Sequence, residues 1–160
     1  MMNIKDEDFV TETVSFGKFI EHIYRNNNYY VGKRLEKYNL NKSEYKYLIQ
    51  IYLNEGICQD DIVNILKVDK YEVAKGIKSL IQKGYIHKEK DSIDKRKHRL
   101  YVTDRANSIK KGFLEILRES SEILTKGFTE EQKNLSIEIF EKMSENMYEE
   151  AMKLKNNKSF

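Results

Sequence analysis

The sequence predicts a mainly α-helical chain that contains one short β-hairpin. Apolar residues recur at helical spacing through most of its 160 residues. The chain contains no proline, the residue that most strongly interrupts long helices. Two short segments, 85–88 and 99–103, flank a charged turn at 91–98, as the two strands of a hairpin would.

The composition is that of one compact protomer, 1–160, with a single core. Hydrophobic residues make up 39% of the chain, which is enough for that core, and charged residues make up 34%. No apolar run approaches the length of a membrane span, and the first nine residues are acidic and polar, unlike a signal peptide. One cysteine cannot form a disulfide within the chain. We therefore expect a cytoplasmic protein with no membrane partner.

Two helices are predicted in the first third of the chain. The first covers 9–38, and the asparagines at 26–28 predict a local irregularity because they are poor helix formers. The segment 41–44, Asn-Lys-Ser-Glu, has the pattern of a capping box that opens a second helix, which Gly56 ends. The residues of the second helix expected to face inward are Tyr45, Leu48, Ile49 and Tyr52.

A helix, a turn and another helix are predicted between Gln59 and Gly84. Asp69 lies in the turn and is suited to cap the following helix by accepting a backbone N–H bond. Gly84 is suited to the left-handed conformation that closes a helix. Val73, Ile77, Leu80 and Ile81 share one face of this second helix. The residues left largely outward are Lys70, Tyr71, Lys75, Lys78 and Ser79.

A helix-turn-helix followed by a basic hairpin is a winged helix, which places its second helix in the major groove of DNA. We assign this lobe to 42–103 and the flanking helical segments to 8–40 and 105–156. The predicted fold is therefore mainly α, with a winged helix-turn-helix core, a small hairpin wing and long helices at both ends.

Positive charge is concentrated in the predicted lobe. Between Lys70 and Arg105 there are eleven Lys/Arg against five Asp/Glu, a net charge of +6, whereas the whole chain carries +3. A basic module in an otherwise acidic chain is expected of a surface that faces phosphates. A solvated charged face is the alternative, but the basic residues coincide with the hairpin and the outer helix face.

Eight residues are candidates for contact with DNA. Arg96 is the strongest, because its planar guanidinium fits a narrow minor groove or the phosphates beside it. Asp94, two positions earlier, is expected to support the wing by holding its turn. The eight candidates are Lys70, Tyr71, Lys75 and Ser79 in the second helix and Lys95, Arg96, Lys97 and Arg99 in the hairpin.

These motifs resemble those of the MarR family of winged-helix transcriptional regulators. The matching segments are Gln59, Val-Asp-Lys at 68–70, Leu-Ile-Gln-Lys-Gly-Tyr-Ile at 80–86, Asp-Lys-Arg at 94–96 and Tyr-Val-Thr at 101–103. Their order and spacing are those of the family. The resemblance implies a sequence-specific regulator of transcription, a repressor released by a small molecule, and not an enzyme.

The resemblance also implies a homodimer in which the terminal helices of two chains intertwine. The apolar stripes at 9–20 and 139–154 permit this, since one small lobe cannot bury them. A two-fold dimer carries two recognition helices roughly 34–36 Å apart and reads a pseudopalindromic operator in double-stranded DNA.

In the family, a pocket between the dimer helices and the lobe binds small aromatic, often anionic, effectors. The candidate lining residues here are Tyr24, Tyr30, Tyr45 and Tyr52, because tyrosine rings offer flat apolar walls with a polar edge. Aromatic core packing is the alternative for these four.

No other chemistry is indicated. There is no cluster at metal-ligand spacing, no nucleophile–histidine–acid arrangement and no phosphate loop, so we expect no metal and no cofactor. Cys58 opens a helix, which favours its thiolate, but Asp60 and Asp61 oppose this, and we expect a structural cysteine. Two alternatives stay open: a thiol-switch regulator using Cys58, and a winged-helix protein-interaction module without an operator.

Overall fold

The computed structural model describes residues 4–156, and the side chains from Phe16 onward. The element order is α1 (Ile4–Leu35), η1 (Glu36–Tyr38), α2 (Glu44–Leu53), α3 (Gln59–Leu66), α4 (Lys70–Gln82), β1 (Ile86–Lys90), β2 (His98–Val102), α5 (Asp104–Leu124) and α6 (Glu130–Asn156). The predicted fold class, helical with one hairpin wing, is confirmed. None of the helices in the described part is long and apolar enough to cross a membrane.

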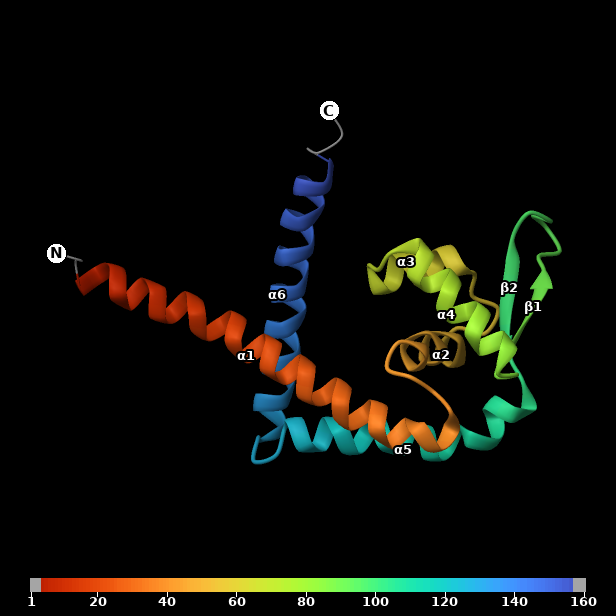
Figure 1. Ribbon diagram of the computed structural model, residues 1–160, viewed down its shortest axis with the longest axis horizontal. Helices are drawn as coiled ribbons and strands as arrows, with labels where there is room; N and C mark the ends of the chain where they lie inside the picture. The colour runs from red at the N-terminus through yellow and green to blue at the C-terminus, as the bar shows by residue number, and fades with distance from the viewer. Residues whose placement is uncertain (1–3, 157–160) are drawn as a thin grey trace.

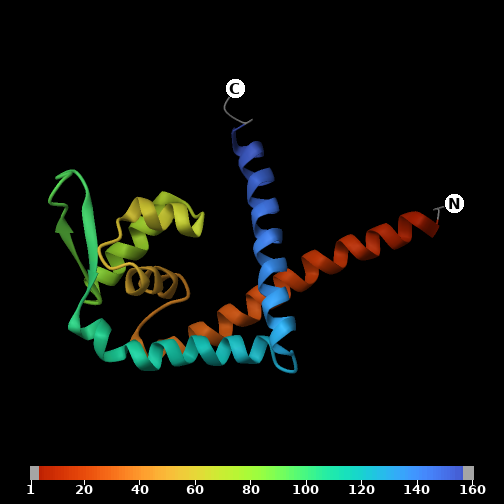
Figure 2. The same cartoon turned by 180° about the vertical axis from the view of Figure 1, so that it is seen from behind.

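The molecule is an angled frame of long helices with a small lobe at one end (Figure 1). The C-terminal half of α1 packs beside α5, and α6 rises from the far end of α5 (Figure 2). α2, α3, α4 and the two strands form the lobe, which is joined to the frame at the end of α1 and the start of α5. The frame therefore holds the lobe from two segments far apart in sequence.

One hydrophobic core joins the lobe to the frame. It contains apolar residues from α1 and α5 together with residues from every element of the lobe. Burying these side chains is the main favourable term in folding, at about 1.5–3 kcal/mol for each large one. The residues with no exposed surface are Leu35, Leu48, Ile51, Ile62, Val73, Ile77, Leu80, Leu100, Ala106 and Phe113.

The predicted helix boundaries in the lobe are confirmed by their caps. Asp69 Oδ1 accepts a hydrogen bond from the backbone N–H of Tyr71 at 2.7 Å, which starts α4. Gly84 closes it with a φ of 73°. Before α2, Asn41 and Glu44 satisfy each other's backbone N–H groups in the expected reciprocal box, at 3.0 and 2.8 Å.

The irregularity expected at 26–28 is absent, since α1 runs through it without a break. Tertiary contacts explain this. Asn28 is buried, and Asn27 Oδ1 accepts a hydrogen bond from the hydroxyl of Ser120 on α5 at 2.5 Å. Such packing outweighs the low helix propensity of asparagine, roughly 0.7 kcal/mol per residue relative to alanine. The helix ends instead in the short η1, where Asn39 adopts a φ of 53°.

The inward face of α2 differs from the predicted one. Tyr47, Leu48 and Ile51 are buried, whereas Tyr45 and Ile49 are only partly covered. The face is rotated because α2 packs directly against α4, where Tyr47 meets Gly76.

β1 and β2 pair antiparallel, with Ile86 opposite Val102 and Lys90 opposite His98. The segment before α3 continues this pairing, because Gly56 and Ile57 exchange backbone hydrogen bonds with Leu100, both at 3.0 Å. The base of the wing is thus hydrogen-bonded to the loop before α3.

Candidate nucleic-acid interface

The outer face of α4 is exposed and basic. Lys70, Tyr71, Lys75 and Lys78 are all exposed, and the Tyr71 side chain leaves 76% of its surface to solvent. Lys70 Nζ lies 2.8 Å from Asp60 on α3, and this hydrogen bond and ion pair raise the pKa of Lys70. The ammonium therefore stays charged and is held at the start of the helix, where groove-entering helices make base and phosphate contacts.

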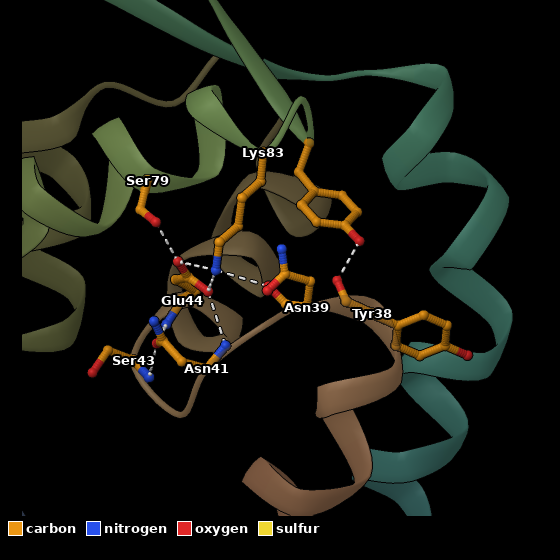
Figure 3. A network of polar contacts seen from close by, with 8 residues as sticks. Tyr38, Asn39, Asn41, Ser43, Glu44, Ser79 and Lys83 are labelled. Carbon is orange, nitrogen blue, oxygen red and sulfur yellow. Dashed lines mark hydrogen bonds and ion pairs between the residues drawn. The ribbon is translucent and has the colours of Figure 1, made fainter.

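Ser79 is less exposed than the other residues expected to face outward from α4. Its hydroxyl donates a 2.5 Å hydrogen bond to Glu44 Oε1 on α2, and the residue is half-buried (Figure 3). A buried carboxylate needs donors, and the Ser79 hydroxyl is one of those within reach. Ser79 therefore takes part in packing α4 onto α2.

The tip of the wing is shaped by Asp91. Its Oδ1 accepts hydrogen bonds from the backbone N–H groups of Ile93 and Asp94, at 2.8 and 2.9 Å. The bond from Asp94, the side chain of Arg99 and the bond from Ile93 lower the Asp91 pKa to about 2. The carboxylate is thus charged at neutral pH and closes the turn that presents residues 92–97.

Arg96 extends from this turn into solvent. Its side chain is 91% exposed, and its Nε donates to Asp94 Oδ1 at 3.1 Å. The contact with Arg96 lowers the pKa of Asp94. Lys95 and Lys97 beside Arg96 are exposed as well. The geometry agrees with the support role expected of Asp94.

Arg99, one of the eight candidate DNA contacts, makes hydrogen bonds within the protein at the base of the wing. Its Nε donates to the buried carboxylate of Asp91, and its second nitrogen donates to the carbonyl of Gly56 at 3.2 Å. The guanidinium thereby ties the wing to the loop before α3. Because Asp91 is buried, its carboxylate needs donors, and Arg99 supplies one in addition to the two backbone N–H groups.

Within one chain, three of the four candidate effector tyrosines make separate contacts. Tyr52 rests on Phe113 with ring centres 5.8 Å apart and donates its hydroxyl to the carbonyl of Ala106 at 2.6 Å. Burial raises its pKa to about 12. Tyr30 reaches Glu119 at 3.4 Å, and Tyr45 is partly buried in the core, where burial raises its pKa.

Only Tyr24 of the four lines a cavity of about 770 Å³. This cavity lies along α1 and the connection between α1 and α2. Its lining residues are Glu21, Tyr24, Arg25, Asn28, Tyr29, Gly32, Lys33, Glu36, Asn39, Leu40, Asn41, Lys42 and Lys83.

Cys58 is buried at the start of α3. Its thiol lies 2.9 Å from Asp61 Oδ2, which also accepts the Cys58 backbone N–H at 3.1 Å. Burial, together with the hydrogen bond from the thiol to Asp61, raises the pKa of Cys58. This disfavours the reactive thiolate. Among residues 4–156 no group of His, Cys, Asp and Glu is placed to hold a metal ion.

Sequence reasoning missed two organising carboxylates, Glu44 and Asp91. Both lie in loops or at a helix end, where an acidic residue is usually solvent-exposed. A signal existed for Glu44, since it is the fourth residue of the capping box, but nothing local indicates its contacts with α4. The spacing of eight residues between Asp91 and Arg99 does not by itself indicate that they pair.

A recognition helix with an exposed basic face, beside a rigid basic wing, defines a winged helix-turn-helix DNA-binding protein. The comparisons agree. The family model for the transcriptional regulator SarA/Rot matches residues 30–113. The uncharacterized HTH-type transcriptional regulator YybA of Bacillus subtilis is 29% identical over 109 residues, which cover 68% of this chain and 73% of that protein.

Solved structures extend the likeness to the long helices. A putative MarR family transcriptional regulator from Listeria monocytogenes, complexed with 26mer DNA, superposes with a TM-score of 0.81 at 27% identity, covering 87% of this chain and 93% of that one. A MarR transcriptional regulator from Methanosarcina mazei gives 0.75 at 30% identity, covering 84% and 96%. The chain therefore belongs to the MarR family of winged-helix transcriptional regulators, which are not enzymes.

Proposed function

We propose that the chain acts as a homodimeric repressor that binds a pseudopalindromic operator and leaves it when a small molecule binds. The observation that carries this proposal is the surface shared by α4 and the wing. There the exposed Lys70, Tyr71 and Lys75 point outward from one helix, and Arg96 is held at the tip of a rigid turn. A helix of this kind reads base edges in the major groove, while the arginine reaches the minor groove or its phosphates.

The homodimer is supported by the apolar surface of the terminal helices. None of the residues of α6, all of which the structure describes, is buried. α1 leaves large apolar side chains in solvent as well, and Phe16 and Phe19 are more than half exposed. The Phe9 side chain, in the predicted N-terminal stripe, lies outside the described side chains. Exposed apolar surface of this extent is typical of an interface.

A mass measurement in solution tests the dimer. We expect light scattering at micromolar concentration to give twice the 19.1 kDa of one chain. Phe140→Asp places a charge on the apolar face of α6 and should shift the mass toward the monomer. Ile93→Asp, a similar change at the exposed wing tip, is the control and should not. A folded monomer in the parent protein would reject the dimer.

The operator is sought in the DNA next to the gene, as an inverted repeat that the protein shifts in a gel at moderate salt. A nonspecific duplex of the same length is the control. If both duplexes bind with equal affinity over a range of salt concentrations, the binding is electrostatic and nonspecific. This result would reject sequence-specific recognition.

The effector proposal rests on the cavity along α1. Tyr24 and Tyr29 offer aromatic walls, and Arg25 and Lys42 offer positive charge, so an aromatic carboxylate fits its chemistry. Such a ligand must prefer a lobe arrangement that does not match the operator, because equal affinity for both states shifts nothing.

Benzoate and its hydroxylated analogues are suitable probes of this cavity. They should lower operator affinity, and the operator should lower ligand affinity by the same factor. Tyr24→Leu should weaken the response, whereas Tyr52→Phe, a change in the core, should not. A response lost with Tyr52→Phe and kept with Tyr24→Leu would move the site elsewhere.

A further inference from the structure

Glu44 is the most deeply buried carboxylate in the described part of the chain, with 1% of its surface exposed. Its two oxygens accept four hydrogen bonds. Oε1 accepts from the Ser79 hydroxyl at 2.5 Å and from Lys83 Nζ at 2.8 Å. Oε2 accepts from Lys83 Nζ at 2.8 Å and from the backbone N–H of Asn41 at 2.8 Å (Figure 3).

Lys83 extends this network to the segment between α1 and α2. Its ammonium also donates to the carbonyl of Asn39 at 2.8 Å, and only 22% of its side chain is exposed. Next to Asn39, the carbonyl of Tyr38 accepts a 2.5 Å hydrogen bond from the hydroxyl of Tyr85, which follows α4. Polar contacts therefore join the end of α4 to the turn that follows α1, at Tyr38 and Asn39.

These contacts lie at the C-terminal end of α4, beyond Lys70, Tyr71 and Lys75. Ser79 and Lys83 continue the row of residues, four apart, that begins with Tyr71 and Lys75, and at this end of the row they bond to Glu44 on α2. Lys75 and Tyr71 remain exposed. Apolar contacts such as those of Ile77 and Leu80 resist separation of the helices, but hydrogen bonds are directional and also resist rotation and sliding.

A buried ion pair adds little net stability, because the cost of removing both charges from water offsets their attraction. Its effect is on geometry. We propose that Glu44 and Lys83 are positioning residues for operator recognition: they set the rotation and depth of α4 relative to the α1–α2 connection without touching DNA. The inference rests on the proposed role of α4 as recognition helix.

Glu44→Gln tests this directly. The amide keeps the shape of the side chain but offers one acceptor oxygen in place of two, so some of the four hydrogen bonds from the three donor groups are lost. The DNA is the duplex that the parent protein selects from a random library, compared with an unrelated duplex of equal length. We expect operator affinity to fall about tenfold or more, with less than about a twofold change on the unrelated duplex.

The matched control is Glu122→Gln. It makes the same chemical change at an exposed glutamate on α5 that pairs with Arg118 at 2.7 Å, and it should leave both affinities unchanged. Circular dichroism and the oligomer mass should be the same for all variants. The ratio of operator affinity to affinity for the unrelated duplex should fall in Glu44→Gln although the variant remains a folded dimer. If Glu44 only stabilised the fold, this ratio would not change.

Ser79→Ala is the milder variant, should Glu44→Gln not fold. It removes one donor and leaves the ion pair, so we expect a smaller loss in the same direction. A double-mutant cycle adds Lys83→Met: the double variant with Glu44→Gln should bind the operator no worse than Lys83→Met alone, because the two residues act as a unit.

Two outcomes overturn the inference. One is parent-like operator affinity in Ser79→Ala and in either Glu44→Gln or Lys83→Met. The other is an equal loss on both duplexes, which would mean that the pair supports general DNA contact or folding. If the parent protein selects no sequence at all, the proposed function fails as well. If it does select one, a failure of the variants concerns only Glu44 and Lys83.

Discussion

The ring of Tyr47 on α2 occupies the space that a side chain at Gly76 on α4 would need. A Cβ added to Gly76 would lie 2.2 Å from Cε2 of Tyr47 and 2.5 Å from its Cδ2. Gly76 is buried in the middle of the recognition helix, where glycine costs about 1 kcal/mol relative to alanine. That cost is accepted because it lets α2 and α4 approach closely. The close packing of α4 against α2 thus depends on the absence of a Cβ at Gly76.

Gly76→Ala should therefore destabilise the protein. The Tyr47 ring must move, and overpacking of a core usually costs about 1–3 kcal/mol, reduced here by the better helix propensity of alanine. We expect a net loss of about 1–2 kcal/mol in urea unfolding. Gly32→Ala in α1 is the matched control, because its added Cβ meets only Lys42 Cβ at 3.9 Å, an ordinary contact, and it should gain up to about 1 kcal/mol. A Gly76→Ala protein as stable as the parent would contradict this packing.

Arg96→Ala should weaken operator binding by roughly 1–3 kcal/mol, or about 5-fold to 150-fold, with helicity and dimer mass unchanged. The side chain is exposed and makes no contact with the core, so its removal acts on DNA contact alone. Lys95→Ala should cost less and should chiefly lower the salt dependence of binding, by about one unit of slope. Both are measured by fluorescence anisotropy over a salt series. Parent-like affinity in Arg96→Ala would show that the wing tip does not reach DNA.

Asp91 should make the order of the wing depend on acid pH. Hydrogen bonds from Asp94, Arg99 and Ile93 lower its pKa from the ordinary 3.8 to about 2 in the folded protein. A carboxyl whose pKa is depressed by folding adds stability that is fully present above the ordinary value and is lost as the pH falls toward about 2. The carboxyl carbon of Asp91, followed by NMR, should titrate near pH 2. A titration midpoint near the ordinary 3.8 would mean that the hydrogen bonds of Asp91 to Asp94, Arg99 and Ile93 are not formed in solution.

Cys58→Ser should bind the operator normally and respond to ligands as the parent does. The raised pKa of the buried thiol leaves little thiolate at neutral pH, and serine supplies a similar hydrogen bond to Asp61. We expect peroxide, followed by dithiothreitol, to leave the DNA affinity of the parent unchanged. Release of DNA by peroxide in the parent, but not in Cys58→Ser, would make this chain a thiol sensor.

Local features of the fold could be predicted from the sequence because their partners are close along the chain. The Asp69 cap binds an N–H two residues on, the capping box at Asn41 closes over three residues, and Gly84 needs only its own backbone freedom. The basic wing and its exposed arginine followed from turn spacing and charge. The family resemblance depended on the same local motifs.

The tertiary structure decided which polar groups are exposed and which pair with distant segments of the chain. Ser79 and Arg99 carry the right chemistry at exposed-looking positions, yet Ser79 donates to Glu44, 35 residues earlier, and Arg99 closes on Asp91. Likewise, α1 runs through 26–28 because Ser120 reaches Asn27 from 93 residues away. Helical periodicity shows which face a residue occupies, but a hydrogen bond between distant segments depends on how their helices pack. That packing was settled by the close contact of Tyr47 with Gly76, for which a single sequence contains no pattern.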